Sequence, residues 1–169
     1  APRLLRTADH GRVWTTGLVL YPMAVLALVL VFRSRLDLAA TAWAVLAVGD
    51  GMATLVGAHV RTAPLPWNRE KSLGGLLAFL IAGSAAAAAM QWWGGNAQTD
   101  LWVLGVAVLA AVAAGFAETI PIRLDDNLTV PAVAAAVLWG TSVMSPTVLV
   151  TAVGAATWWM VLLNIVVAI

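Results

Sequence analysis

The segment that decides the fold class is the apolar run over residues 38–60, LAATAWAVLAVGDGMATLVGAHV. A helix that crosses a bilayer needs about 20 consecutive, mostly apolar residues, and this run is long enough. It contains one charged residue, Asp50, between Gly49 and Gly51. Because the run is continuous and does not alternate between apolar and polar residues, it predicts a membrane-spanning helix rather than a strand.

Similar apolar runs lie on both sides of this segment. They cover residues 13–32, 73–93 and 101–118, followed by a tract over 128–169 that is too long for one crossing. We expect Ser145-Pro146 to divide that tract, because the residue before a proline is disfavoured in a helix. We therefore predict an all-α fold, a polytopic transmembrane helix bundle of about six spanning helices, forming a single integral-membrane domain over residues 1–169.

The composition excludes several other classes of protein. Hydrophobic residues make up 62% of the chain and charged residues 10%, whereas a soluble domain has about 25% charged residues. A net charge of +1 provides no basic surface for nucleic acid. The absence of cysteine excludes disulfides and thiolate metal sites. The chain begins at Ala1 without Met, so processing and excision from a longer chain both stay open.

Positive charge is distributed unevenly between the two sides of the predicted bundle. The N-terminal segment and the polar loops 61–72 and 119–129 lie on one side and carry seven Lys and Arg residues. The opposite side carries only Arg33 and Arg35. The positive-inside rule makes the seven-charge side cytoplasmic. Both polar loops are therefore expected to face the compartment that supplies nucleotides and Mg²⁺.

Asp50 is the most informative candidate for a functional residue. A carboxylate in the middle of a span costs about 2.5–3.5 kcal/mol, and such a residue usually faces the protein interior or a water-filled cavity. Asp50 and Arg61 are eleven residues apart, about three helical turns, so we expect them on one helix face. Gly49, Ala53 and Gly57 recur at four-residue spacing, which lets a helix or a ligand approach closely. A structurally paired, buried Asp is the alternative.

The second candidate is the polar segment 68–75, NREKSLGG. Ser72 is expected to be the N-cap of the next helix, and a helix N-terminus is suited to bind phosphate. Lys71 lies beside it, and Gly74 and Gly75 present no side-chain obstruction. A membrane-surface loop with an ordinary helix cap is the alternative.

The third candidate combines Glu118 with Asp125, Asp126 and Asn127. Oxygen ligands of this kind suit Mg²⁺, which usually takes one or two carboxylates plus substrate phosphates. Asp125 and Asp126 are neighbours that point in different directions, so one of the two is expected to bind the metal directly. An acidic turn that caps the next helix is the alternative.

The three candidates together indicate phosphoryl transfer. Carboxylates that converge repel one another unless a cation neutralises them, and a divalent metal also bridges phosphate oxygens. Lys71, Arg69 and Arg61 lie on the same side and would neutralise the remaining phosphate charge. Phosphoryl transfer depends mainly on positioning and charge neutralisation, and an acid near the acceptor hydroxyl can act as the base.

These motifs, in this order, resemble the phytol kinase and dolichol kinase family. That family includes CTP-dependent diacylglycerol kinases and is distantly similar to phosphatidate cytidylyltransferases. The resemblance covers about residues 15–145, and the chain is shorter at its N-terminus than many members. The matching residues are Gly49-Asp50-Gly51-Met52-Ala53 with Gly57, Asn68-Arg69-Glu70-Lys71-Ser72 with Gly74-Gly75, and Glu118 with Asp125-Asp126-Asn127-Leu128-Thr129-Val130-Pro131.

The resemblance implies a membrane kinase that transfers the terminal phosphate of a nucleoside triphosphate, commonly CTP, to a prenol such as phytol, geranylgeraniol or a polyprenol, with Mg²⁺ as cofactor. It carries over six active-site positions, Asp50, Lys71, Glu118, Asp125, Asp126 and Asn127. Together with the residue patterns described above, three groups of site residues are expected. The expected catalytic residues are Asp50, Lys71 and Asp126. The expected nucleotide-binding residues are Arg61, Asn68, Arg69, Lys71, Ser72, Gly74, Gly75 and Asn127. The expected metal ligands are Asp50, Glu118, Asp125 and Asp126.

Other functions stay open at the level of the sequence. A CTP-dependent diacylglycerol kinase or a phosphatidate cytidylyltransferase-like enzyme would use the same parts, and the second would release pyrophosphate. A small ion-coupled transporter would use Asp50 as its ion site, although that leaves the clustered loop residues unexplained. The residues do not distinguish CTP from ATP and do not indicate the lipid chain length or the oligomeric state.

Overall fold

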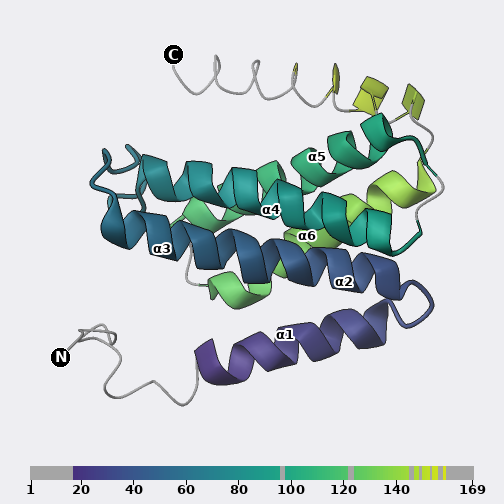
Figure 1. Cartoon of the computed structure of the whole chain (residues 1–169), viewed down its shortest axis with the longest axis horizontal. Coiled ribbons are helices and arrows are strands. Elements are labelled where there is room, and N and C mark those ends of the chain that lie inside the picture. Colours follow the sequence, from purple (N-terminus) through teal and green to yellow (C-terminus); the bar gives the residue numbers. More distant parts are fainter. Residues whose placement is uncertain are drawn as a thin grey trace. The chain divides into compact units, whose positions relative to one another are not determined.

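The computed structural model describes residues 17–95, 98–121 and 124–144, and residues 147–148, 150–152, 154–155 and 158. Within these residues the regular secondary structure is helical (Figure 1). The one strand-like pairing among them is an isolated bridge between Pro64 and Ser72. The helices are α1 (Gly17–Val31), α2 (Leu36–Ala44), the π-helix η1 (Val45–Asp50), α3 (Gly51–His59), α4 (Leu73–Trp93), α5 (Asp100–Thr119) and α6 (Asp126–Val143). The predicted all-α class is confirmed.

Three helical stretches are long and apolar enough to cross a membrane: Leu36–His59, Leu73–Trp93 and Asp100–Thr119. They confirm the predicted spans over 38–60, 73–93 and 101–118. The first predicted span, over residues 13–32, contains α1, which is a shorter apolar helix. The predicted tract over 128–169 contains most of α6. The sixth predicted span and its boundary at Ser145-Pro146 lie mostly outside the described residues.

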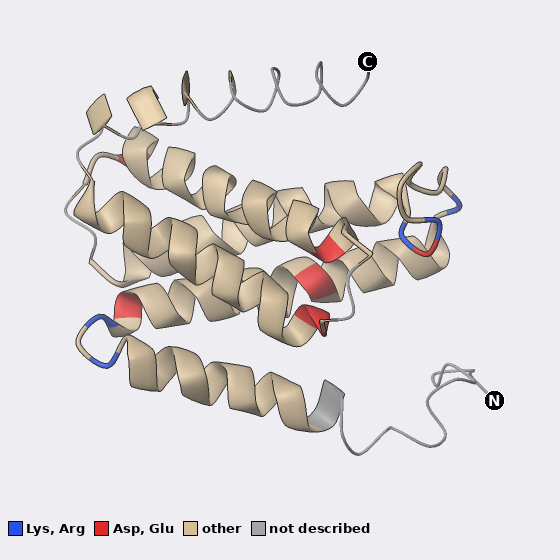
Figure 2. Cartoon of the chain, turned by 180° about the vertical axis from the view of Figure 1, so that it is seen from behind, with Lys and Arg blue, Asp and Glu red and all other residues tan. Residues whose placement is uncertain are grey.

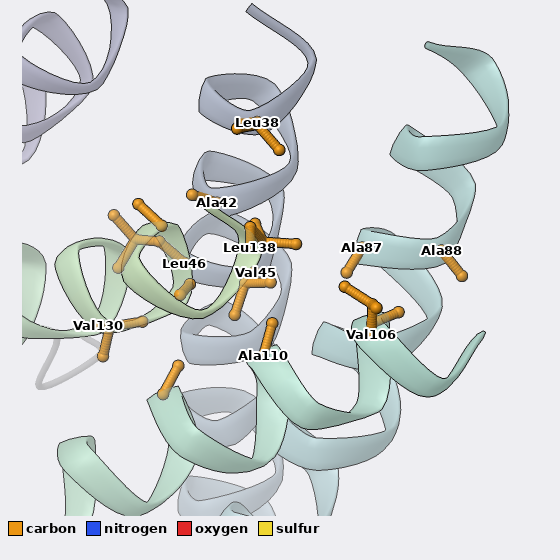
Figure 3. Close-up of a cluster of buried hydrophobic side chains, with 14 of the residues drawn as sticks. Leu38, Ala42, Val45, Leu46, Ala87, Ala88, Val106, Ala110, Val130 and Leu138 are labelled. Atoms are coloured by element: carbon orange, nitrogen blue, oxygen red, sulfur yellow. The ribbon is translucent and has the colours of Figure 1, made fainter. Parts of the chain in front are cut away.

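The chain forms two compact units, residues 1–138 and residues 139–169. Within the first unit, α4 packs against α5 on one side and against α2, η1 and α3 on the other. Small side chains dominate the buried core of this unit, and they let the helices approach closely. Figure 3 shows Leu46, Val130 and Leu138 in this core, together with Ala87 and Ala110.

Phe79 of α4 fills a space that Gly49 of η1 and Gly115 of α5 provide. The ring is fully buried. A Cβ atom added at Gly49 would lie 3.1 Å from the ring, and one at Gly115 would lie 2.9 Å from it. The stripe of Gly49, Ala53 and Gly57 therefore faces a neighbouring helix, α4. Its spacing predicts the close approach of either a helix or a ligand, and the structure has the helix.

Gly115 is expected to be sensitive to substitution, since its Cβ would also lie 3.1 Å from Leu80. We expect Gly115→Ala to lower the free energy of unfolding by about 1–3 kcal/mol through overpacking. Gly105→Ala in the same helix is the control, because a Cβ atom there has no neighbour within 4 Å. Thermal unfolding of the protein in detergent measures both, and equal effects of the two substitutions would contradict the packing argument.

Candidate active site

Three segments that are far apart in the sequence meet at the Lys71 ammonium group. Its Nζ lies 2.7 Å from Oε1 of Glu118 and 2.8 Å from Oδ2 of Asp126. Lys71 belongs to the loop between α3 and α4, whereas Glu118 lies in the last turn of α5 and Asp126 begins α6. The sequence prediction that these residues converge is therefore confirmed for Lys71, Glu118 and Asp126.

The two ion pairs of Lys71 differ in their exposure to solvent. The side chain of Glu118 is 5% exposed, whereas that of Asp126 is 39% exposed. A buried charge that loses its partner is strongly destabilising, so Glu118 needs Lys71 for stability. Asp126 is hydrated, so replacing Lys71 by another charged group costs less free energy at Asp126 than at Glu118.

Burial would lower the pKa of Lys71, but hydrogen bonds and ion pairs with Asp126 and Glu118 outweigh this effect and raise its pKa above the ordinary value. The ammonium form therefore persists at neutral pH. A charge whose pKa is raised by folding stabilises the protein at every pH below its unfolded pKa, and this stabilisation is lost as the pH rises through the folded pKa.

We accordingly expect the contribution of Lys71 to stability to stay constant from pH 7 to about 10, which is near the ordinary pKa of lysine, and to decline only above that range. The comparison is between the wild type and Lys71→Met/Glu118→Gln, which has neither charge. Melting temperatures in detergent across this range provide the measurement. A difference that already disappears near pH 8 would contradict the raised pKa.

Asp50 ends the π-helix η1 and is half-buried. It interacts electrostatically with Lys71, Asp126 and Asp125, so it belongs to the same cluster. Its carboxylate makes no hydrogen bond or ion pair with any residue that the structure describes. A carboxylate without a partner inside a span fits a functional role better than a structural one, and π-helical segments occur frequently at functional sites.

The position of Arg61 corrects one sequence prediction. α3 ends at His59, and Val60 has extended dihedral angles of φ −104° and ψ 115°. Arg61 therefore lies in the loop, and the prediction that it shares a helix face with Asp50 is wrong. The exposed side chains of Arg61 and Arg69 have no hydrogen bond or ion pair with any described residue. In Figure 2, the Lys and Arg residues of the described chain are confined to the α1–α2 and α3–α4 loops.

Ser72 is the N-cap of α4, as predicted, and its Oγ accepts a hydrogen bond from the Gly75 N–H at 3.2 Å. The Gly74 N–H donates to Oγ1 of Thr62 at 2.9 Å, and the Leu73 N–H donates to the Ala63 carbonyl at 2.9 Å. These three N–H groups at the helix start thus have acceptors within the protein. Phosphate binding by Ser72, Gly74 and Gly75 stays a prediction.

Asp125 caps α6. Capping of the next helix was the alternative to metal binding in the sequence analysis of this acidic turn. Its Oδ1 accepts hydrogen bonds from the Asn127 N–H at 2.9 Å and from Nδ2 of Asn127 at 2.7 Å. No three Asp, Glu or His side chains in the described part of the chain are grouped closely enough to hold a metal ion together. Metal binding by Asp50, Glu118, Asp125 and Asp126 stays a prediction, as does nucleotide binding by Asn127.

Trp67 and Thr119 were missed by sequence reasoning. Nε1 of Trp67 donates to Oγ1 of Thr119 at 3.1 Å, and Nδ2 of Asn68 donates to the Thr119 carbonyl at 3.0 Å. A tryptophan directly before Asn68 in a polar loop was the one available signal. These bonds connect the loop of Lys71 to the end of the helix that carries Glu118.

Comparison with known proteins gives a consistent family. The chain is 32% identical to a protein of Glycine max named probable phytol kinase 2, chloroplastic, over 129 residues, which is 73% of this chain and 44% of that protein. A probable phytol kinase of Zea mays is 32% identical over 121 residues, 68% of this chain and 40% of that protein. The chain belongs to the phytol kinase-like family.

Another relative within this family is a farnesol kinase of Arabidopsis thaliana, which is 33% identical over 91 residues, 50% of this chain and 29% of that protein. The chain spans less than half the length of these phytol kinase-like relatives. No protein-family profile matches the chain, and no solved structure matches it.

Proposed function

We propose that the chain forms the catalytic region of a membrane kinase that transfers the terminal phosphate of a nucleoside triphosphate to the hydroxyl group of a prenol. The observation that carries this proposal is the Lys71 ammonium group at the junction of a loop and two helices, in one cluster with the carboxylate of Asp50, with which no described residue pairs. The names of the relatives, phytol kinase and farnesol kinase, support a prenol as acceptor.

In the proposed reaction, the prenol oxygen forms a bond to the terminal phosphorus while the bond from that phosphorus to the bridging oxygen breaks. Asp50 accepts the hydroxyl proton, and the nucleoside diphosphate leaves. Lys71 stabilises the negative charge on the phosphate oxygens, with Arg61 and Arg69 providing further positive charge. Charge stabilisation and positioning of this kind account for most of the catalysis in phosphoryl transfer.

We also propose that Mg²⁺ is the cofactor and that CTP is the donor. The carboxylates of Asp50, Asp125 and Asp126 interact electrostatically, and Mg²⁺ needs only one or two carboxylates when phosphates complete its ligands. The donor set therefore fits the ion. Asp126 and one carboxylate oxygen of Asp50 would hold it, which leaves the other oxygen of Asp50 to accept the hydroxyl proton. When bound, Mg²⁺ would neutralise phosphate charge. The choice of CTP rests on the family resemblance alone.

The membrane topology is part of the proposal. Three helices are long and apolar enough to span a bilayer, and the first of these starts after Arg33 and Arg35 and ends before Arg61. We infer a multi-pass protein whose α3–α4 loop faces the cytoplasm. Glu70→Cys, introduced into the cysteine-free chain, tests this with a membrane-impermeant maleimide. Labelling from the opposite side would contradict the topology.

The test of the function uses the full-length protein, CTP or ATP labelled in the terminal phosphate, Mg²⁺, and phytol, geranylgeraniol, undecaprenol or diacylglycerol in separate reactions. We expect label in a prenyl monophosphate and release of the nucleoside diphosphate. Label in diacylglycerol alone would indicate a diacylglycerol kinase, and pyrophosphate release would indicate cytidylyl transfer. Absence of any phosphorylated lipid from folded protein, with nucleotide-independent ion uptake in proteoliposomes, would indicate a transporter.

A further inference from the structure

Hydrogen bonds between its own backbone groups close the α3–α4 loop. The Leu65 N–H donates to the Lys71 carbonyl at 2.9 Å, and the Leu73 N–H donates to the Ala63 carbonyl at 2.9 Å. Inside this closed loop, the Lys71 N–H donates to the Asn68 carbonyl at 3.1 Å. The side chain of Leu65 is 2% exposed, which anchors the loop in the apolar core.

Two side chains of this loop bind the end of α5 at a single residue, Thr119, which is 2% exposed. The Thr119 hydroxyl donates to the Phe116 carbonyl at 2.8 Å. Its one proton is therefore used, and its oxygen accepts from Nε1 of Trp67. The Thr119 carbonyl is one of the carbonyls without an intrahelical partner at a helix C-terminus, and Asn68 supplies the missing donor.

Both the nitrogen and the oxygen of the Asn68 amide group take part in this arrangement. Its Nδ2 donates to Thr119, and its Oδ1 accepts from the Glu70 N–H at 3.1 Å. The contacts of Asn68 are those of a residue that fixes the loop, whereas its sequence motif suggested nucleotide binding. Lys71 lies three residues after Asn68, and Glu118 directly precedes Thr119. The same contacts therefore fix both partners of the buried ion pair.

We propose that residues 63–72 form a positioning arm for Lys71, and that Trp67 and Asn68 hold this arm on α5 at Thr119. This inference rests on the proposed catalytic role of Lys71. Trp67 and Asn68 are positioning residues, which act through Lys71 and need not touch the substrates. A misplacement of about 1 Å in a positioning contact can cost about 100-fold in rate. Loss of either hydrogen bond to Thr119 is therefore expected to slow the reaction.

Two substitutions remove one donor each; the first keeps an aromatic ring, and the second keeps the shape of the side chain while it adds a negative charge. Trp67→Phe removes the indole N–H, and Asn68→Asp removes the amide N–H while it keeps the Oδ1 acceptor for Glu70. Thr119→Ser is the conservative control, because it keeps both the hydroxyl group and the carbonyl. Trp93→Phe is the control for the loss of an indole, since Trp93 is 82% exposed at the end of α4.

The first measurement is independent of any enzymatic activity. Spin labels on Glu70→Cys in the arm and Phe116→Cys on α5 report the distance between the two elements, and the chain has no other cysteine. We expect one narrow distance distribution in the full-length, doubly labelled protein that is otherwise wild type, and the same distribution when Thr119→Ser or Trp93→Phe is added. We expect a broad distribution in Trp67→Phe and Asn68→Asp. A narrow distribution in both of these variants would overturn the proposal.

The second measurement separates positioning from simple stabilisation. We expect Trp67→Phe and Asn68→Asp to lower kcat per folded molecule by about 10- to 100-fold, with a smaller change in the KM for the nucleotide. An unchanged kcat beside a lowered melting temperature would indicate a purely structural joint and overturn the positioning role. If the wild type transfers no phosphate, the proposed function fails, while the spin-label distances still decide whether the arm is held as described.

Discussion

Lys71→Ala is expected to abolish phosphate transfer and to destabilise the fold at the same time. Activity falls because the positive charge on the phosphates is lost, and removal of one such electrostatic group typically costs about 100- to 1,000-fold in kcat. Stability falls because Glu118, whose side chain is 5% exposed, is left as an uncompensated buried charge. Loss of one partner of a buried ion pair costs about 3–5 kcal/mol.

A second variant separates the two effects of this substitution. In Lys71→Met/Glu118→Gln the buried carboxylate is neutral, so we expect most of the stability to return while transfer stays absent. Labelled phosphate transfer and thermal unfolding, measured on the same preparations, provide the comparison. Normal turnover by this double variant would show that Lys71 has only a structural role.

Asp50→Asn is expected to stop turnover without loss of stability. If Asp50 accepts the hydroxyl proton, its replacement should lower kcat by about 100- to 10,000-fold, the range for a general base. The fold should tolerate the change because no described residue pairs with the Asp50 carboxylate, and because an uncharged side chain in a span is less costly than a charged one.

The same span provides a matched control for Asp50. Asp37, near its other end, pairs with Arg35 at 2.8 Å, and both side chains are solvent-exposed. An exposed pair of this kind contributes about 1 kcal/mol or less. Asp37→Asn should therefore leave both stability and phosphate transfer near the wild-type values. Equal loss of activity in Asp37→Asn and Asp50→Asn would indicate a general effect of charge in the helix and contradict the proposed base.

The helices were predictable because their signal is local. Each continuous apolar run is itself long enough to form a helix across a membrane, so the runs over 73–93 and 101–118 coincide with α4 and α5 within one residue at each end. The cap of Ser72 was predictable for the same reason, because its acceptor and donor lie three residues apart. The convergence of Lys71, Glu118 and Asp126 was also expected, because the positive-inside rule places both polar loops on one side of the membrane and carboxylates that converge need a cation.

The features that could not be predicted depend on contacts between distant segments. The π-helix over Val45–Asp50 packs against α4, and a Cβ atom at Gly49 would lie 3.1 Å from the Phe79 ring. The spacing of Gly49, Ala53 and Gly57 predicts close approach of a helix or a ligand, but it specifies neither α4 nor the π-helical turn. The hydrogen bonds of Trp67 and Asn68 join residues 52 and 51 positions apart. α3 ends at His59, which separates Arg61 from the helix face of Asp50, and the chain then enters the loop that the hydrogen bond from Leu73 to Ala63 closes.

The central claim, that a triphosphate binds with its terminal phosphate at Lys71, can be tested by covalent capture. Lys71 is the only lysine among these 169 residues. A nucleoside triphosphate analogue with an acyl group on its terminal phosphate acylates a lysine next to that phosphate. Applied to the full-length protein at about pH 10, near the ordinary pKa of lysine, so that part of the amine is neutral, and followed by mass spectrometry, it should modify Lys71, and unmodified triphosphate should protect it. Saturable binding of the triphosphate with Lys71 unmodified would contradict the account.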